Sequence, residues 1–198
     1  MKPRSPRAPS FAATGVLALL LVTGMARPGA AEALPDKIAV LTGFGQSSPL
    51  DPQLVPVMAQ LQWRAPEAIN SVLGKAQLRL NWLSEAWAAG IMASPSAFEV
   101  GVNPLGVELA WDGGQRVVPF VQVAIGLLLT NLQGYPTGGA FQFDETGGVG
   151  VDFFLNRTTA ISLMYRYRHM SNAGIYEANR GLDTHYGLIG IAIHLDRH

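Results

Sequence analysis

The sequence predicts an all-β fold, an eight-stranded antiparallel transmembrane β-barrel, and three observations support this prediction. The chain is rich in apolar residues (48%) and poor in charged ones (14%). After residue 33, however, it contains no continuous apolar span. About eight segments instead alternate apolar with polar residues, and clusters of Gly, Pro, Asn and Asp separate them. A chain that is apolar overall but alternates within each segment is typical of a barrel whose strands face lipid on one side.

Residues 1–33 have the organisation of a secretory signal peptide. A basic start precedes an apolar run over residues 11–26, and small residues follow, with Ala31 and Ala33 in an A-x-A cleavage pattern. The alternative is a transmembrane anchor, which needs about 20 apolar residues. This run is shorter and ends in an Arg-Pro pair. We therefore expect residues 1–33 to be removed and residues 34–198 to form one outer-membrane barrel domain.

Charge and cysteine content exclude several classes. After removal of residues 1–33 the chain holds 10 basic and 13 acidic residues, a net charge of about −3. This balance argues against a nucleic-acid-binding protein. The sequence has no cysteine, which excludes lipoprotein processing and a disulfide framework.

The candidate strands follow one another along the whole mature chain. Most are close to the 9–11 residues that a tilted transmembrane strand needs, and eight strands make the smallest common membrane barrel. The segments are 37–45, 55–64, 76–87, 98–111, 116–130, 147–155, 160–171 and 184–195.

Two of these segments need separate justification. In 98–111 the apolar residues fall on even positions before Asn103 and Pro104 and on odd positions after them, which predicts a bulge or a turn there. Residues 82–93 also carry apolar side chains at helical spacing, so a helix is the alternative for them. We retain a strand because the neighbouring segments alternate.

Segment 160–171 places its two arginines on one face. Side chains alternate across a strand, so Arg166 and Arg168 share the even face. A cationic side chain on the lipid face at mid-bilayer costs roughly 2–4 kcal/mol, so these arginines point into the lumen. Their candidate lumenal partners are Glu99, Glu108 and Asp152.

The odd face of the same segment is therefore the outer one, and it carries His169 and Ser171. In segment 184–195 the isoleucines mark the outer parity, and Asp183 shares that parity. If the two segments pair as a hairpin, His169, Ser171 and Asp183 lie together on the lipid-facing side, near one membrane boundary. A substrate for a site so placed has to be a lipid.

These three residue types are those of nucleophilic catalysis. A serine hydroxyl needs a base to take its proton, and the base works better when an acid orients it. The Asn172 amide, or backbone N–H groups near Gly174, would stabilise the oxyanion of an ester under attack. Taken alone this spacing is a weak signal, and the alternative is the solvated rim of a non-catalytic barrel.

The remaining polar and aromatic residues of these two segments have simpler interpretations. His185 is expected to be an interfacial polar residue on the outer face. His194 is expected to point into the lumen without an assigned role. Tyr165 and Tyr167 are expected to be girdle or packing residues.

A resemblance adds to these observations. The stretch "HMSNAG" at 169–174, "NRG" at 179–181 and an acid at Asp183 resemble the active-site segment of the lipid A 3-O-deacylase family of PagL-like outer-membrane barrels. The run that precedes the histidine also resembles the family, so the likeness covers roughly residues 138–195. Two features depart from the pattern. The best-known members carry glutamate where this chain has Asp183, and the chain ends in "HLDRH" rather than in an aromatic residue.

The resemblance implies an eight-stranded outer-membrane barrel that hydrolyses the ester-linked 3-hydroxyacyl chain at position 3 of lipid A, without metal or cofactor. His169 would be the base, Ser171 the nucleophile and Asp183 the acid. Asn172 and Gly174 would form the oxyanion hole. The partner would be lipid A or lipopolysaccharide in the membrane, and a homodimer is left open. The alternatives are a non-catalytic outer-membrane barrel and a soluble periplasmic β-barrel that binds a ligand.

Overall fold

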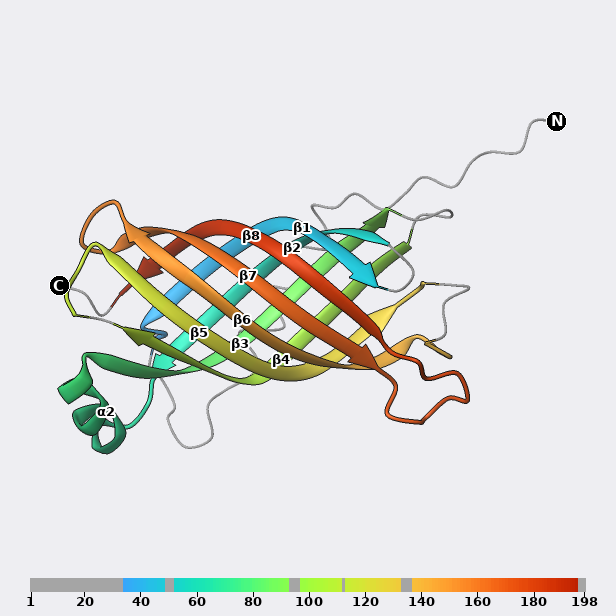
Figure 1. Cartoon of the computed structure of the whole chain (residues 1–198), viewed down its shortest axis with the longest axis horizontal. Helices are drawn as coiled ribbons and strands as arrows, with labels where there is room; N and C mark the ends of the chain where they lie inside the picture. The colour runs from blue at the N-terminus through green and yellow to red at the C-terminus, as the bar shows by residue number, and fades with distance from the viewer. Residues whose placement is uncertain (1–33, 49–51, 93–96, 112, 133–136, 196–198) are drawn as a thin grey trace.

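The computed structural model describes residues 34–48, 52–92, 97–111, 113–132 and 137–195. The predicted signal peptide, residues 1–33, lies outside the described residues. In the described part, eight antiparallel strands form one closed barrel, in which each strand pairs with the next along the chain and the last pairs with the first (Figure 1). The predicted fold class, an eight-stranded antiparallel barrel, is therefore confirmed.

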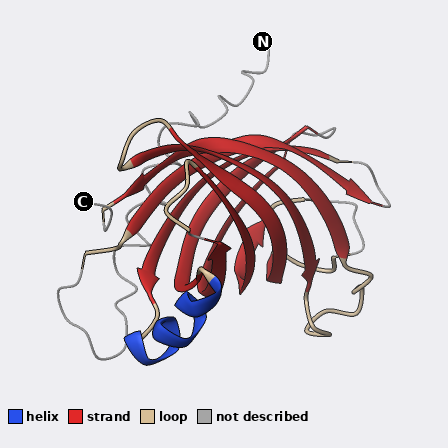
Figure 2. Cartoon of the chain, turned by 60° about the vertical axis from the view of Figure 1, so that its left-hand side comes forward, coloured by secondary structure: helices blue, strands red, loops and turns tan. Residues whose placement is uncertain are grey.

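The strands run in chain order around the barrel wall. Between β2 and β3 the chain forms a short helix, α2 (Glu67–Leu73), and a 3-10 turn, η1 (Gly74–Ala76). Helix α2 lies beyond the strand ends at one end of the barrel (Figure 2). The strands are β1 Lys37–Ser48, β2 Gln53–Arg64, β3 Leu78–Met92, β4 Ala97–Trp111, β5 Val117–Thr130, β6 Phe141–Phe154, β7 Thr159–Ser171 and β8 Leu182–His194.

The structure tests two of the strand predictions made from the sequence. Residues 82–92 belong to β3, so the strand interpretation is confirmed over the helical one. The register between β4 and β5 shifts between Val102 and Leu105, which confirms an irregularity at Asn103–Pro104 within a continuous strand. The register between β3 and β4 shifts at the same place, where Ser84 of β3 lies opposite both Pro104 and Leu105, so the two shifts report one bulge on β4.

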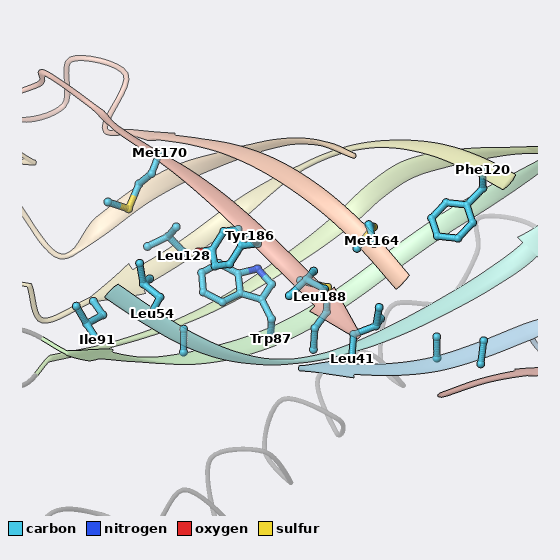
Figure 3. Packing of buried hydrophobic residues seen from close by; sticks show 14 of the residues in the cluster. Leu41, Leu54, Trp87, Ile91, Phe120, Leu128, Met164, Met170, Tyr186 and Leu188 are labelled. Atoms are coloured by element: carbon cyan, nitrogen blue, oxygen red, sulfur yellow. The ribbon is translucent and has the colours of Figure 1, made fainter. Parts of the chain in front are cut away.

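Apolar side chains fill part of the space that the strands enclose (Figure 3). Leu54, Trp87, Leu128 and Tyr186 are among these buried residues. Even-numbered residues of β7 are buried while odd-numbered ones are partly or fully exposed. The outside of the barrel carries many exposed apolar residues, such as Val123 on β5. Among the described residues, no helix is long and apolar enough to cross a membrane.

Charged residues inside the barrel are paired with one another. Arg168 Nη1 donates to Glu99 at 2.6 Å, as predicted. Arg166 binds Glu85 instead of one of the three predicted acids. The two other candidates, Glu108 and Asp152, both bind Lys37.

These pairings are set by distances across the lumen. They depend on strand tilt and on the β4 bulge, whereas strand parity indicates only that a side chain points inward. His194 is buried in the lumen as predicted, with Nε2 3.2 Å from Asp152.

Candidate active site

The barrel brings His169 and Asp183 together on its outer face. The register of β7 and β8 places the two residues directly opposite each other. Ser171, the last residue of β7, follows His169 by two positions and so shares its face. All three residues are partly exposed, while their neighbours Met170 and Thr184 are buried. The hairpin pairing and the outward orientation expected from parity are thus present.

The histidine is held by the aspartate. His169 Nδ1 and Asp183 Oδ1 are 2.7 Å apart, so a neutral imidazole donates its Nδ1 hydrogen to the carboxylate. Nε2 is then left as the proton acceptor. An aspartate reaches the histidine although the best-known relatives carry the longer glutamate, because the two Cα atoms are direct cross-strand partners.

A tyrosine shares the same carboxylate oxygen. Tyr167 Oη donates to Asp183 Oδ1 at 2.8 Å. Tyr167 was expected to be a girdle or packing residue, and parity on β7 indicated its outward direction but not this hydrogen bond. Beside it, Tyr165 Oη lies 2.6 Å from His185 Nδ1. The outer faces of β7 and β8 therefore carry two hydrogen-bonded groups side by side, Tyr165 with His185 and Tyr167 with Asp183 and His169.

The serine hydroxyl is not engaged by its neighbours. Within the described part of the chain, Ser171 Oγ makes no hydrogen bond to His169 or to another side chain. Two positions along a strand correspond to about 6–7 Å between Cα atoms, so side-chain rotation brings Ser171 Oγ within reach of the imidazole. The residues predicted to be nucleophile and base are therefore adjacent on one face.

The loop after Ser171 is organised by Asn172. The fully buried Asn172 amide donates to the backbone carbonyls of Thr137 (2.9 Å) and Ala178 (2.8 Å), and its Oδ1 accepts from Gly174 N–H at 2.8 Å. Ala173 and Gly174 both have positive φ, 51° and 84°, as the two central residues of a type I′ turn do. The polar atoms expected to form the oxyanion hole therefore hold the loop in this conformation, and the oxyanion role of Asn172 and Gly174 stays a prediction.

Two further loop residues support this arrangement. Asn179 Oδ1 accepts from the backbone N–H of Asn172 at 2.9 Å. Gly181 has a φ of 69°, and a Cβ atom there would lie 2.7 Å from His169 Cε1. Only glycine fits this close approach, so the "NRG" stretch helps to place the imidazole.

An apolar groove of about 920 Å³ opens on the outer face beside the histidine. His169, Tyr167 and Glu145 form part of its lining at one side, and Glu145 is the register partner of His169 on β6. Further along, the lining is largely apolar and includes Val107, Val123 and Trp82. No local motif predicts this groove, because it follows from strand order and register.

Comparisons with known proteins match this architecture. Residues 57–192 match the family model "Lipid A 3-O-deacylase (PagL)". The lipid A deacylase PagL of Bordetella bronchiseptica is 34% identical over 100 residues, which are 49% of this chain and 51% of that protein. The chain thus matches about half the length of this curated relative.

Solved structures show the same fold. The crystal structure of the outer membrane enzyme PagL superposes with a TM-score of 0.62 at 16% identity, covering 77% of this chain and 97% of that chain. Neisserial surface protein A gives a TM-score of 0.51 at 12% identity, with 80% of this chain and 96% of that chain covered. Because the family model spans more than half of the sequence, this chain belongs to the lipid A 3-O-deacylase (PagL) family.

Proposed function

We propose that this protein is an outer-membrane esterase that removes the 3-hydroxyacyl chain ester-linked at position 3 of lipid A. One observation carries the proposal: a hydrogen-bonded His169–Asp183 pair lies beside an unengaged Ser171 on the apolar outer face of the barrel. Family membership supports the substrate class. The name of the Bordetella relative agrees with it.

The mechanism follows from the three groups. Ser171 Oγ attacks the ester carbonyl carbon while His169 Nε2 takes the hydroxyl proton. Asp183 orients the imidazole and stabilises its cationic form. The carbon–oxygen bond to the sugar then breaks, and His169 returns the proton to the leaving sugar oxygen. Water, deprotonated by His169, attacks the acyl-enzyme and releases the fatty acid together with free Ser171.

The orientation of the site fits a substrate that stays in the membrane. The exposed apolar residues on the outside of the barrel would contact lipid, and charged residues buried in the lumen would not. A lipid A molecule in the same leaflet then reaches Ser171 by lateral diffusion. Residues 1–33 would act as the signal peptide that directs export, and residues 34–198 would form the outer-membrane barrel domain.

The test is lipid A analysis by mass spectrometry. Cells that express the wild-type chain are expected to lose one 3-hydroxyacyl group from lipid A, and cells that express Ser171→Ala are expected to keep it. Purified Ser171→Ala is expected to lose at least about 10³-fold in rate, the scale of nucleophile removal in serine hydrolases.

Ser71→Ala is the matched control. Ser71 lies on α2, between β2 and β3, whereas Ser171 ends β7 at the opposite end of the barrel. The control is expected to deacylate as the wild type does. Equal acylation patterns in all three strains, with each protein folded in the outer membrane, would leave a non-catalytic barrel as the function.

A further inference from the structure

Glu145 is an acidic residue on the outer face of β6 that the proposed mechanism does not use. It is exposed and lies directly opposite His169 in the register of β6 and β7. In the described part of the chain, its carboxylate makes no hydrogen bond and no ion pair. A charged side chain on the lipid-facing surface of a barrel costs free energy. An unpaired carboxylate at this place therefore points to a hydrogen-bond donor that a ligand brings.

The imidazole of His169 does not need Glu145 as a partner. His169 lies between two acidic residues, Asp183 on β8 and Glu145 on β6. Its Nδ1 is bound to Asp183 at 2.7 Å, and its Nε2 has to stay free to accept the Ser171 proton. An ionised carboxylate has no hydrogen to donate, so it forms no hydrogen bond with the unprotonated Nε2. Glu145 is thus left as an acceptor for the substrate.

The two sides of His169 differ in the room that they leave for a substrate. On the β8 side, Asp183 Oδ1 already accepts hydrogen bonds from His169 and from Tyr167. On the β6 side, Gly147 follows Glu145 by two positions and has open space where a Cβ atom would lie. A bound ester therefore meets the Glu145 carboxylate as an unused acceptor on the open side.

The substrate class proposed above carries a donor at a matching distance. In a 3-hydroxyacyl ester the hydroxyl oxygen is three bonds from the carbonyl carbon, which corresponds to roughly 3–4 Å for bonds of ~1.5 Å. Directly opposite residues on neighbouring strands have Cβ atoms about 4.5–5.5 Å apart. A carbonyl carbon held beside His169 thus places the 3-hydroxyl within reach of Glu145. An unsubstituted acyl chain brings no donor to the carboxylate.

We propose that Glu145 is a specificity-determining residue, which accepts a hydrogen bond from the 3-hydroxyl of the acyl chain under attack. This role rests on the esterase function proposed above and assigns its preference for 3-hydroxyacyl esters to one carboxylate. A site that binds a substrate hydroxyl disfavours the analogue that lacks it, because the protein group is then left unpaired. A single acceptor on one side of the chain also distinguishes the two configurations of the hydroxyl-bearing carbon.

The experiment compares the hydrolysis of two lipid A analogues by the purified protein in detergent. The analogues carry 3-O-acyl chains of equal length, one with a 3-hydroxyl group and one without it. The wild type is expected to hydrolyse the hydroxylated ester with a kcat/KM about tenfold higher or more, the scale of one hydrogen bond to a charged group. Glu145→Ala is expected to lose this preference and to keep the wild-type rate on the unsubstituted ester.

Two further variants sharpen the comparison. Glu145→Gln keeps an acceptor oxygen but not the charge, so it is expected to retain part of the preference. Glu177→Ala is the matched control, because it removes an exposed acid from the loop after Ser171 and is expected to keep the full preference. With a pair of analogues of opposite configuration at the hydroxyl-bearing carbon, the wild type is expected to favour one, and Glu145→Ala neither.

The outcomes separate the two proposals. Absence of Ser171-dependent hydrolysis on both analogues would overturn the esterase function, and the role of Glu145 falls with it. Ser171-dependent hydrolysis without a preference in the wild type, or with an unchanged preference in Glu145→Ala, would overturn the role of Glu145 alone. An equal loss of rate on both esters in Glu145→Ala would overturn it as well. Heat-modified mobility on gels confirms that each variant is a folded barrel.

Discussion

The two faces of strand β7 use polar residues for opposite purposes. On the inner face, Arg166 and Arg168 are each 2% exposed and bind acidic side chains across the lumen. On the outer face, His169 and Asp183 keep 38% and 44% of their side chains exposed while hydrogen-bonded to each other. Strand β7 thus contributes two arginines to a buried ionic network on one face, and on the other face it places His169 in an exposed pair with Asp183 of β8.

The two faces differ in how many polar atoms remain available to bind a ligand. Glu85 accepts hydrogen bonds from Arg166, from Gln60 at 2.6 Å and from Asn103 at 3.0 Å, so the carboxylate is fully used by protein donors. Such a buried group stabilises the barrel only while its partners are present. On the outer face, His169 Nε2 and Ser171 Oγ stay available. The polar groups of Glu85 inside the barrel are occupied by protein partners, whereas those of His169 and Ser171 outside it are left for a ligand.

The largest expected effect on stability is that of removing a buried charge from the lumen. Glu85→Ala leaves Arg166 buried without its partner, which is expected to lower the free energy of unfolding by about 3–5 kcal/mol. Urea denaturation in detergent, followed by tryptophan fluorescence, measures the change. The folded fraction is expected to keep its esterase rate within a few-fold, because Glu85 points into the lumen.

Val149→Ala is the control for the inner charge. Val149 is an exposed residue on the outer face of β6, and its replacement is expected to leave stability nearly unchanged. If Glu85→Ala unfolds no more readily than Val149→Ala, the inner network is not what stabilises the barrel.

The next largest effect is expected on the hydrolysis rate, when Asp183 on the outer face is replaced. Asp183→Asn removes the charge that orients and stabilises His169, and we expect the rate to fall by about 10²-fold. The loss is smaller than at a fully buried triad because water reaches this carboxylate. Steady-state kinetics measures it, and unfolding in urea is expected to match the wild type.

Asp183→Glu is the control for this substitution. Glutamate keeps the charge and restores the residue of the best-known relatives, so a rate near that of the wild type is expected. An Asp183→Asn protein with full activity would remove Asp183 from the mechanism.

Much of this arrangement can be predicted from residue order. Strand alternation is a local property, so the number of strands, the inward direction of Arg166 and Arg168 and the outward direction of His169, Ser171 and Asp183 all follow from it. The predicted break at Asn103–Pro104 also follows, because a change of apolar parity is visible in the chain itself.

The alternation of side chains along a strand does not predict the distances between residues on strands that are not neighbours. The partner of Arg166 is Glu85, which lies on a strand across the lumen and pairs in register with Asn103 at the edge of the β4 bulge. The apolar groove beside His169 has the same origin, since Gly147, Val107 and Trp82 become one surface only through three successive registers. The Tyr167–Asp183 hydrogen bond depends on side-chain rotamers, which parity does not specify.

The smallest expected effect on the outer face is that of Tyr167→Phe, which removes one hydroxyl and keeps the ring that lines the apolar groove beside His169. Because Tyr167 positions Asp183 and does not touch the reacting atoms, we expect kcat to fall about threefold to tenfold, the scale of one partly exposed hydrogen bond to a charged group, with little change in KM. Tyr165→Phe is the matched control, since its hydroxyl binds His185 instead of Asp183. The decisive measurement is the double variant with Asp183→Asn. If Tyr167 acts through Asp183, adding Tyr167→Phe to Asp183→Asn costs nothing further, whereas additive losses would mean that the hydroxyl works independently of the carboxylate.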